Sequence, residues 1–250
     1  MRFQITEAVK NLLIINVLLF IGTLAFGGGE LFYKLFSLYF PKNERFNFWQ
    51  LLTHMFMHGN AIHLLSNMFV LWMFGTAVEQ RLGAKKFLFV YFSAGLGALA
   101  FQLGFHYFEF INGYEKLIEA GVSDSTIINT LNEGMIKKDW RFILGNDLNS
   151  FAESFVIPMV GASGCLMGIL VAFGMMNPNA ELMMIFLPIP IKAKYFIPGI
   201  IGLDIISALT GQSFLSPSNT AYMAHIGGAF IGFIVMWYWK KNNMDQYRFY

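Results

Sequence analysis

The chain alternates between long apolar stretches that carry no charge and shorter polar connections. Stretches near the roughly 20 residues that a membrane-spanning helix needs occur six times, at residues 12–26, 61–78, 87–108, 157–176, 195–211 and 219–239. Only Asp204 interrupts them, so 31 of the 32 charged residues lie outside. This pattern predicts an all-α polytopic membrane protein with six transmembrane helices, and we expect residues 1–250 to form a single membrane domain.

The composition supports this fold class. Charged residues make up 13% of the chain, against about 25% in typical soluble domains, and hydrophobic residues make up 56%. These values exclude an ordinary soluble domain and a disordered chain. The net charge of +2 is too small and too dispersed to indicate a nucleic-acid partner. The single cysteine, Cys165, excludes an intramolecular disulfide and a cysteine-rich metal site.

The basic residues are divided unevenly between the two ends of the predicted helices. One set of ends holds ten basic and four acidic residues, whereas the other holds seven basic and ten acidic ones. The ten basic residues are Arg2, Lys10, Arg81, Lys85, Lys86, Lys192, Lys194, Lys240, Lys241 and Arg248. Because Lys and Arg gather on the cytoplasmic side of membrane proteins, we expect a multi-pass protein of the cell (inner) membrane with both termini in the cytoplasm.

Two long connections lie on the opposite side. Residues 31–40 in the first are rich in aromatic residues but interrupted by charge, which is typical of an interfacial element in the headgroup layer. The second, at residues 109–155 between the third and fourth spans, carries twelve charges, eight of them acidic, within residues 109–153. It predicts an extramembrane insertion of two short helices. Such an insertion could gate access, recognise a substrate or simply decorate the loop.

Polar residues inside the predicted spans are candidates for function, because each costs free energy in hydrocarbon. Ser163 and His225 each adjoin a strip of small residues that allows a neighbouring helix to approach closely. The strips are Gly164 and Gly168 on one helix and Ala224, Gly228 and Gly232 on the other. Packing of strip against strip would bring the hydroxyl within reach of the imidazole, as a nucleophile and its base require. From these residues alone, a packing serine and a satisfied core histidine remain the alternative.

His63 and Asn67 are four residues apart and therefore share one face of the second predicted span. Both side chains can donate hydrogen bonds. Together with backbone N–H groups at the start of the Ser163 helix, they could stabilise the negative oxygen that develops in acyl transfer.

Other interpretations of the polar residues are weaker. His54 and His58 stand four apart with His63 nearby, but the chain lacks the HExxH pattern of zinc proteases, so we expect neither a metal nor another cofactor. We expect Asp204 to form a capping or interhelical hydrogen bond and not to act as a third catalytic residue. Cys165 is expected to be buried packing beside the serine.

Several motifs together resemble the rhomboid family of intramembrane serine proteases. They are Thr53-His54-Met55-Phe56-Met57-His58 followed by His63 and Asn67; Gly75, Glu79-Gln80-Arg81 and Gly83; Gly161-Ala162-Ser163-Gly164; residues 188–194, Pro-Ile-Pro-Ile-Lys-Ala-Lys; and Ala224-His225-Ile226-Gly227-Gly228 with Gly232. Gly-x-Ser-Gly alone is a weak signal. All of these motifs in order, on six apolar spans, are a specific match over nearly the whole chain outside the insertion.

The resemblance implies a six-helix rhomboid bundle and a Ser-His dyad, with Ser163 as the nucleophile and His225 as the base. It also implies that His63, Asn67 and the backbone N–H of Ser163 hold the oxyanion. The substrates would be transmembrane proteins cut in or near their membrane segments, and the fifth helix with the loop at residues 212–220 would move aside for them. The oligomeric state is left open.

One position departs from the family pattern, and one alternative function stays open. Many family members have Arg where this chain has Gln50, so the first loop is expected to be held differently. The alternative function is a non-proteolytic membrane scaffold or a small transporter. However, no internal repeat of the kind common in transporters is visible, and both Ser163 and His225 are present.

Overall fold

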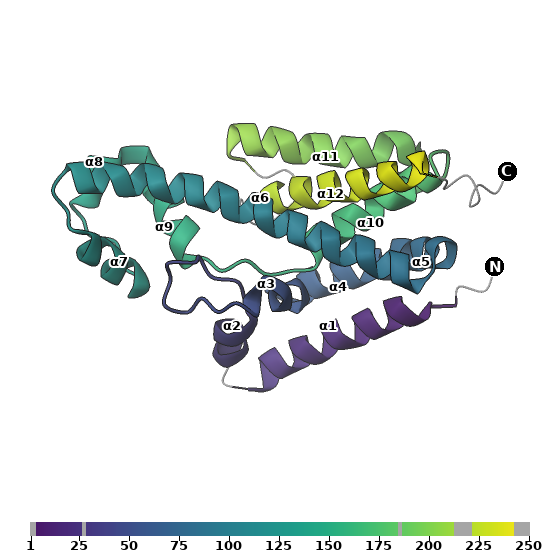
Figure 1. Ribbon diagram of the computed structural model, residues 1–250, viewed down its shortest axis with the longest axis horizontal. Coiled ribbons are helices and arrows are strands. Elements are labelled where there is room, and N and C mark those ends of the chain that lie inside the picture. The colour runs from purple at the N-terminus through teal and green to yellow at the C-terminus, as the bar shows by residue number, and fades with distance from the viewer. Residues whose placement is uncertain (1–3, 27–28, 185–186, 213–221, 243–250) are drawn as a thin grey trace.

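The computed structural model describes residues 4–26, 29–184, 187–212 and 222–242. The described chain is a helical bundle with a group of short helices at one end (Figure 1). The helices are α1 (Glu7–Ala25), α2 (Glu30–Phe36), α3 (Gln50–Thr53), η2 (His54–Phe56), α4 (Ala61–Val70), η3 (Leu71–Gly75), α5 (Thr76–Leu82), α6 (Ala84–Glu119), α7 (Asp124–Asn132), α8 (Trp140–Leu144), η4 (Gly145–Asp147), α9 (Leu148–Val156), α10 (Ser163–Met176), α11 (Ala193–Thr210) and α12 (Tyr222–Lys241).

The predicted all-α polytopic fold class is confirmed. Five helical segments of the described chain are long and apolar enough to cross a membrane, namely α1, Ala61–Leu82, α6, α11 and α12. The second of these runs through α4 and α5 with a π-helical turn, η3, between them. Residues 213–220 of the loop expected to move, the expected start of the sixth span at residues 219–221, and Arg2 and Arg248 lie outside the described residues.

The fourth predicted span, residues 157–176, was wrong in its first part. Helix α10 begins only at Ser163 and has 14 residues, which corresponds to about 21 Å at 1.5 Å per residue. Pro158 lacks a backbone N–H, and Gly161 adopts a positive φ of 122° that other residues rarely accept. Met159 instead exchanges two backbone hydrogen bonds with Leu38 of the first loop. An apolar run alone does not distinguish this extended segment from a helix.

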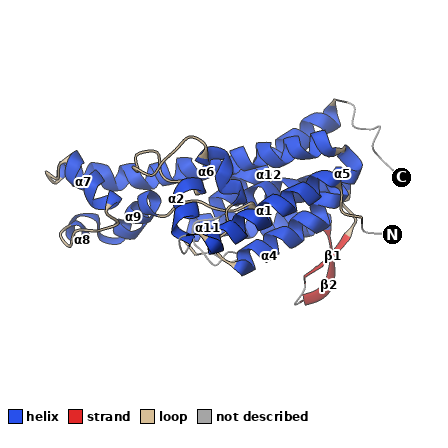
Figure 2. Ribbon diagram, turned by 90° about the horizontal axis from the view of Figure 1, so that it is seen from below, coloured by secondary structure: helices blue, strands red, loops and turns tan. Residues whose placement is uncertain are grey.

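The connection after the third span also differs from the prediction. Helix α6 does not end near residue 108 but continues to Glu119, so that its 36 residues extend about 54 Å. Three short helices, α7, α8 and α9, fold back against this extension, where two were expected (Figures 1 and 2). Phe110, Phe151 and Phe155 form the centre of their apolar cluster, to which Phe40 of the first loop also belongs. The insertion therefore has an apolar core of its own, which the number of its charged residues did not predict.

The first loop is held by a neutral side chain. Of the expected interfacial element at residues 31–40, residues 31–36 belong to helix α2, whereas Leu38, Tyr39 and Phe40 are buried within the protein. Gln50 is fully buried as well. The Gln50 side chain accepts hydrogen bonds from the backbone N–H groups of Tyr39 and Asn47 and donates to the carbonyls of Lys34 and Arg45. Four backbone contacts of a neutral side chain therefore hold the first loop.

The opposite end of the bundle is fixed by charged residues. Glu79 accepts hydrogen bonds from the backbone N–H groups of Ala8 and Val9, which start α1, and a carboxylate is favourable at a helix N-terminus. Arg81 donates to the carbonyl of Met176, which ends α10. An antiparallel hairpin of β1 (Glu181–Met184) and β2 (Leu187–Lys192), which the sequence did not predict, lies at this end as well (Figure 2).

Glycines bring α6, α10 and α12 into close contact. A Cβ atom at Gly164 would overlap the side chain of Ala98 on α6, and one at Gly228 would overlap the backbone carbonyl of Gly164. A Cβ at Gly232 would lie 2.5 Å from the Cα of Gly168. The two strips predicted from the sequence therefore do pack against each other, and they determine how α10 and α12 face one another.

Candidate active site

Ser163 is the first residue of α10, where backbone N–H groups have no acceptor within the helix. The first bond of this helix runs from the N–H of Leu166 to the carbonyl of Ala162. The N–H groups of Ser163, Gly164 and Cys165 therefore have no acceptor within the helix, as at every α-helix N-terminus. The preceding turn is fixed because the N–H of Gly161 donates to the carbonyl of His54 at 2.9 Å. Such donors can bind a negative oxygen.

His63 lies against the backbone just before Ser163. A Cβ at Gly161 would be 3.0 Å from Nε2 of His63 and 3.8 Å from Oγ of Ser163, so only glycine leaves room for the imidazole here. Nδ1 of His63 accepts the N–H of Gly59 at 3.5 Å. The ring proton then resides on Nε2, which is the nitrogen beside Gly161. His63 is therefore a hydrogen-bond donor toward the start of α10.

Asn67 lies one turn further along α4, on the same face as His63. It is buried, and its Nδ2 has no hydrogen-bond partner among the described residues. Buried donors without a partner are uncommon, and a catalytic role is one explanation for them. Asn60 fixes the start of this helix, since its side chain accepts the N–H of His63 at 2.8 Å. This N-cap was not anticipated, although an asparagine directly before an apolar helix is a recognisable signal.

His225 lies in the first turn of α12, beside Ala224. The backbone of Ala224 packs near Gly164, 3.5 Å from the position that a Cβ there would take, so Ser163 and His225 each adjoin a point of helix contact. Gln102 of α6 accepts the N–H of Ala224 at 3.1 Å and lies 2.6 Å from the ring of His106. Gln102 was not among the predicted site residues, although a polar amide inside an apolar span indicates a possible functional residue.

A carboxylate lies on the other side of His225. Nδ1 of His225 is 3.1 Å from Oδ2 of Asp204 on α11. The expectation of an interhelical hydrogen bond for Asp204 is therefore confirmed, and its partner is the candidate base. Because a carboxylate accepts the proton of Nδ1, the Nε2 atom of His225 is left as the acceptor.

The structure therefore brings the predicted site residues toward one region. Ser163 and His63 flank Gly161, and Ala224, the neighbour of His225, lies near Gly164. Cys165 is buried behind Ser163, as expected for packing. The catalytic roles of these residues stay predictions. His54 and His58 take other positions: Nδ1 of His54 lies 2.8 Å from the carbonyl of Gln50, and the His58 ring packs edge-on against that of His63.

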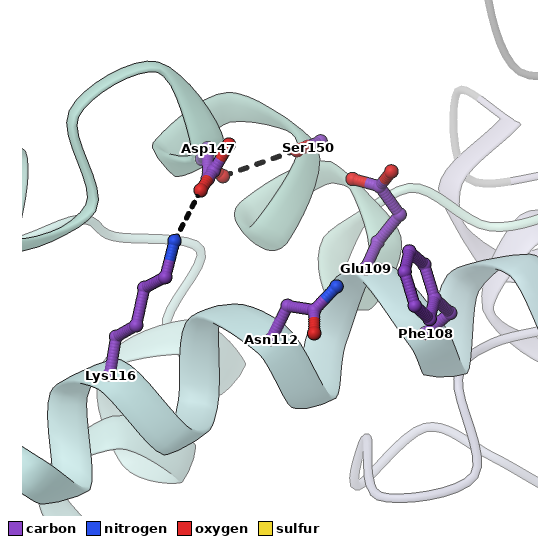
Figure 3. Close-up of a pocket in the computed structure, with 6 residues that line it drawn as sticks. All are labelled: Phe108, Glu109, Asn112, Lys116, Asp147 and Ser150. Carbon is purple, nitrogen blue, oxygen red and sulfur yellow. Dashed lines mark hydrogen bonds and ion pairs between the residues drawn. The ribbon is translucent and has the colours of Figure 1, made fainter. Parts of the chain in front are cut away.

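A separate groove lies on the insertion (Figure 3). It is lined by Phe108, Glu109, Asn112, Lys116, Asp147 and Ser150. Lys116 and Asp147 form an ion pair of 2.6 Å across it, and Ser150 donates to the backbone carbonyl of Asp147. The groove shares no residue with the candidate site, and the hydroxyl of Ser150 donates to the backbone of its own turn. We therefore locate the candidate chemistry at Ser163.

A comparison with known families identifies the bundle. Residues 45–242 match the family model described as the Rhomboid domain. The chain belongs to the rhomboid family. The match covers every candidate site residue and supports intramembrane protease activity in general.

Curated relatives of this rhomboid share about a quarter of its residues. Rhomboid protein 1, mitochondrial, of Saccharomyces cerevisiae is 27% identical over 187 residues, covering 74% of this chain and 40% of the yeast protein. Presenilin-associated rhomboid-like protein, mitochondrial, of Rattus norvegicus is 28% identical over 75% of this chain and 36% of the rat protein. RHOMBOID-like protein 12, mitochondrial, of Arabidopsis thaliana is 26% identical over 80% of this chain and 48% of the plant protein. The chain spans less than half the length of these relatives.

Proposed function

We propose that this rhomboid is an intramembrane serine endopeptidase that hydrolyses peptide bonds in or near the transmembrane segments of other membrane proteins. The observation that carries the proposal is the position of Ser163. It begins a helix whose first N–H groups lack intrahelical acceptors, with the His63 ring across Gly161. A packing serine would not need the glycine that admits the His63 ring beside it.

The reaction follows from the roles of two side chains. Oγ of Ser163 attacks the carbonyl carbon of the scissile bond while Nε2 of His225 takes the hydroxyl proton. The tetrahedral intermediate collapses as the C–N bond breaks, and His225 returns that proton to the leaving nitrogen. A water molecule then attacks the acyl-enzyme with His225 again as the base, which releases the second product and restores Ser163.

The oxyanion of the intermediate would be held by neutral donors. These are the backbone N–H of Ser163, Nε2–H of His63 and the amide of Asn67, whose Nδ2 is buried without a partner. Fixed donors aimed at the developing charge contribute strongly in a site shielded from water, where removal of one donor typically costs about 100-fold or more in rate.

Hydrolysis inside a membrane requires that water reach Ser163. Helix α10 is about 21 Å long, whereas the hydrocarbon core is about 30 Å thick. Arg81 of α5 binds the C-terminal end of α10. Ser163, at the other end of this short helix, would therefore lie below the opposite membrane surface. Residues Gly164–Ala172 of α10 are all buried by protein. Because other helices surround it, α10 does not need to be long enough to span the lipid.

The same proposal includes the placement of the whole chain. Residues 1–250 would form one membrane domain with residues 109–155 as its extramembrane part. Both termini would face the cytoplasm of the cell membrane, because Lys86 and Lys241 stack on Trp239 and Trp237 at the α5 end of the bundle. Basic residues are typical of the cytoplasmic ends of membrane helices, whereas aromatic residues are found at both interfaces.

Cleavage of a reporter with a single transmembrane helix tests the function. The purified protein in lipid vesicles should cut the reporter, and Ser163→Ala should abolish the cut because no hydroxyl remains to attack. The variant must keep the thermal unfolding midpoint of the unaltered protein. Turnover by a folded Ser163→Ala variant would overturn the assignment of the nucleophile.

A further inference from the structure

We infer that Asp204 is a positioning residue of the catalytic site, which holds His225 in the tautomer and orientation needed for proton transfer. The inference rests on the proposed function, because it requires that His225 is the base. It adds a carboxylate, contributed by a separate helix, to the Ser-His pair that the family resemblance implies.

The geometry favours this role over a purely structural one. Asp204 is 2% exposed and lies in the middle of α11, far from either helix end, so it caps neither terminus. In the described part of the chain, its hydrogen-bond partner is Nδ1 of His225 at 3.1 Å. Thr210 of the same helix, in contrast, satisfies its hydroxyl on the helix itself by donating to the carbonyl of Ile206.

Among the described residues, no Lys or Arg forms an ion pair with Asp204. Helix α10 contains no charged residue, and α11 carries a single basic residue, Lys194, in its first turn. His106 of α6 is paired with Gln102, and the further titratable group close to His225 is His63 of α4. Burial of an unpaired carboxylate is costly. Proton uptake by His225 during the reaction would supply the missing positive charge.

The chemical consequence concerns the ring nitrogens of His225. A carboxylate at Nδ1 fixes the proton there, so that Nε2 carries the free electron pair. Asp204 makes and breaks no covalent bond in this role and acts only as the acceptor of the hydrogen bond from Nδ1–H. When Nε2 accepts the proton of Ser163, the resulting imidazolium is stabilised by Asp204. An uncharged amide at position 204 would permit the opposite tautomer.

Kinetics of Asp204→Asn test this role. The variant should lower kcat for the reporter at least about 10-fold, as expected when a serine protease loses its tautomer control, while KM stays within about twofold. Thr210→Ala, which removes a polar contact of the same helix away from His225, should leave both constants within about twofold. A kcat for Asp204→Asn within 10-fold of the unaltered protein would overturn the inference.

A spectroscopic measurement keeps the test valid if the variant does not fold. In the unaltered protein with ¹⁵N-labelled histidine, the neutral ring of His225 should carry its proton on Nδ1, assigned by loss of the signal in His225→Gln. A proton on Nε2 would overturn the inference. Ser163→Ala and His225→Ala are measured in parallel. If either variant still cleaves the reporter, the proposed function fails and the inference fails with it. If both are inactive while Asp204→Asn is fully active, the inference alone is overturned.

Discussion

The membrane bundle and the insertion differ in the side chains through which their helices pack. In the bundle, α10 and α12 touch through Gly164, Gly168, Gly228 and Gly232, and large apolar residues such as Leu18 and Leu209 face outward. In the insertion, the ring of Phe110 stacks on those of Phe151 and Phe155 at 5.5 and 5.7 Å between centroids, and the segment carries many charges. The two regions meet along a single helix, α6.

This difference follows from the surroundings of each region. Lipid tails are as apolar as leucine, so helices in a membrane gain little by burying large side chains and associate through close backbone contact instead. In water, burial of aromatic area is itself the driving force. The close approach of α10 and α12 also positions Ser163 relative to His225. The contact that stabilises the bundle is thus part of the candidate site.

The largest effect is expected from Gly228→Val. Its side chain would overlap the carbonyl of Gly164 and force α10 away from α12, so reporter cleavage should be lost and the unfolding midpoint lowered. Gly104→Ala is the matched control, because a Cβ at this α6 position meets nothing within 4 Å. It should keep full activity. Normal cleavage by Gly228→Val would refute the proposed role of the glycine contact.

A smaller effect on activity is expected from Phe110→Ala in the insertion. Phe110 is fully buried, and loss of such a ring costs about 3–5 kcal/mol of stability. Limited proteolysis should cut residues 109–155 faster, while cleavage of the reporter falls less than in Gly228→Val. Phe142→Ala, whose side chain is 90% exposed, should change neither. Complete inactivity of Phe110→Ala with an intact bundle would mean that the two regions are not separable.

The smallest effect is expected at the ion pair of Lys116 and Asp147. Both side chains are about half exposed, and such pairs contribute less than about 1 kcal/mol. Lys116→Ala should therefore shift the unfolding free energy no more than Lys34→Ala, which breaks a similar exposed pair with Glu30. A loss several times larger would show that the insertion depends on charge as well as on its aromatic core.

The sequence predicted the bundle well because a helix that crosses a bilayer needs a long apolar run. Long apolar runs gave the helices α1, α4–α5, α6, α11 and α12, and the small-residue strips gave the contact of α10 with α12. The start of α10 could not be predicted by counting apolar residues. It depends on the positive φ of Gly161 and on the pairing of Met159 with Leu38, 121 positions earlier in the chain.

The site was predictable in its residue types but less so in its partners. The family motifs pointed to Ser163, His225, His63 and Asn67; the structure places His63 beside Gly161 and Ala224, the neighbour of His225, near Gly164. The bond between Asp204 and His225 could not be inferred, because it depends on the rotation of α11 against α12. Four backbone contacts of Gln50 likewise arise only when the first loop folds around it.

Labelling by a serine-directed fluorophosphonate tests the central claim most directly, since it needs no knowledge of the natural substrate. The reagent forms a phosphorus–oxygen bond with an activated serine and releases fluoride. The folded protein should be labelled once, at Ser163. Ser163→Ala should not be labelled, and His225→Ala should react far more slowly because no base activates the hydroxyl. Equal labelling of the unaltered protein and folded Ser163→Ala would contradict the account.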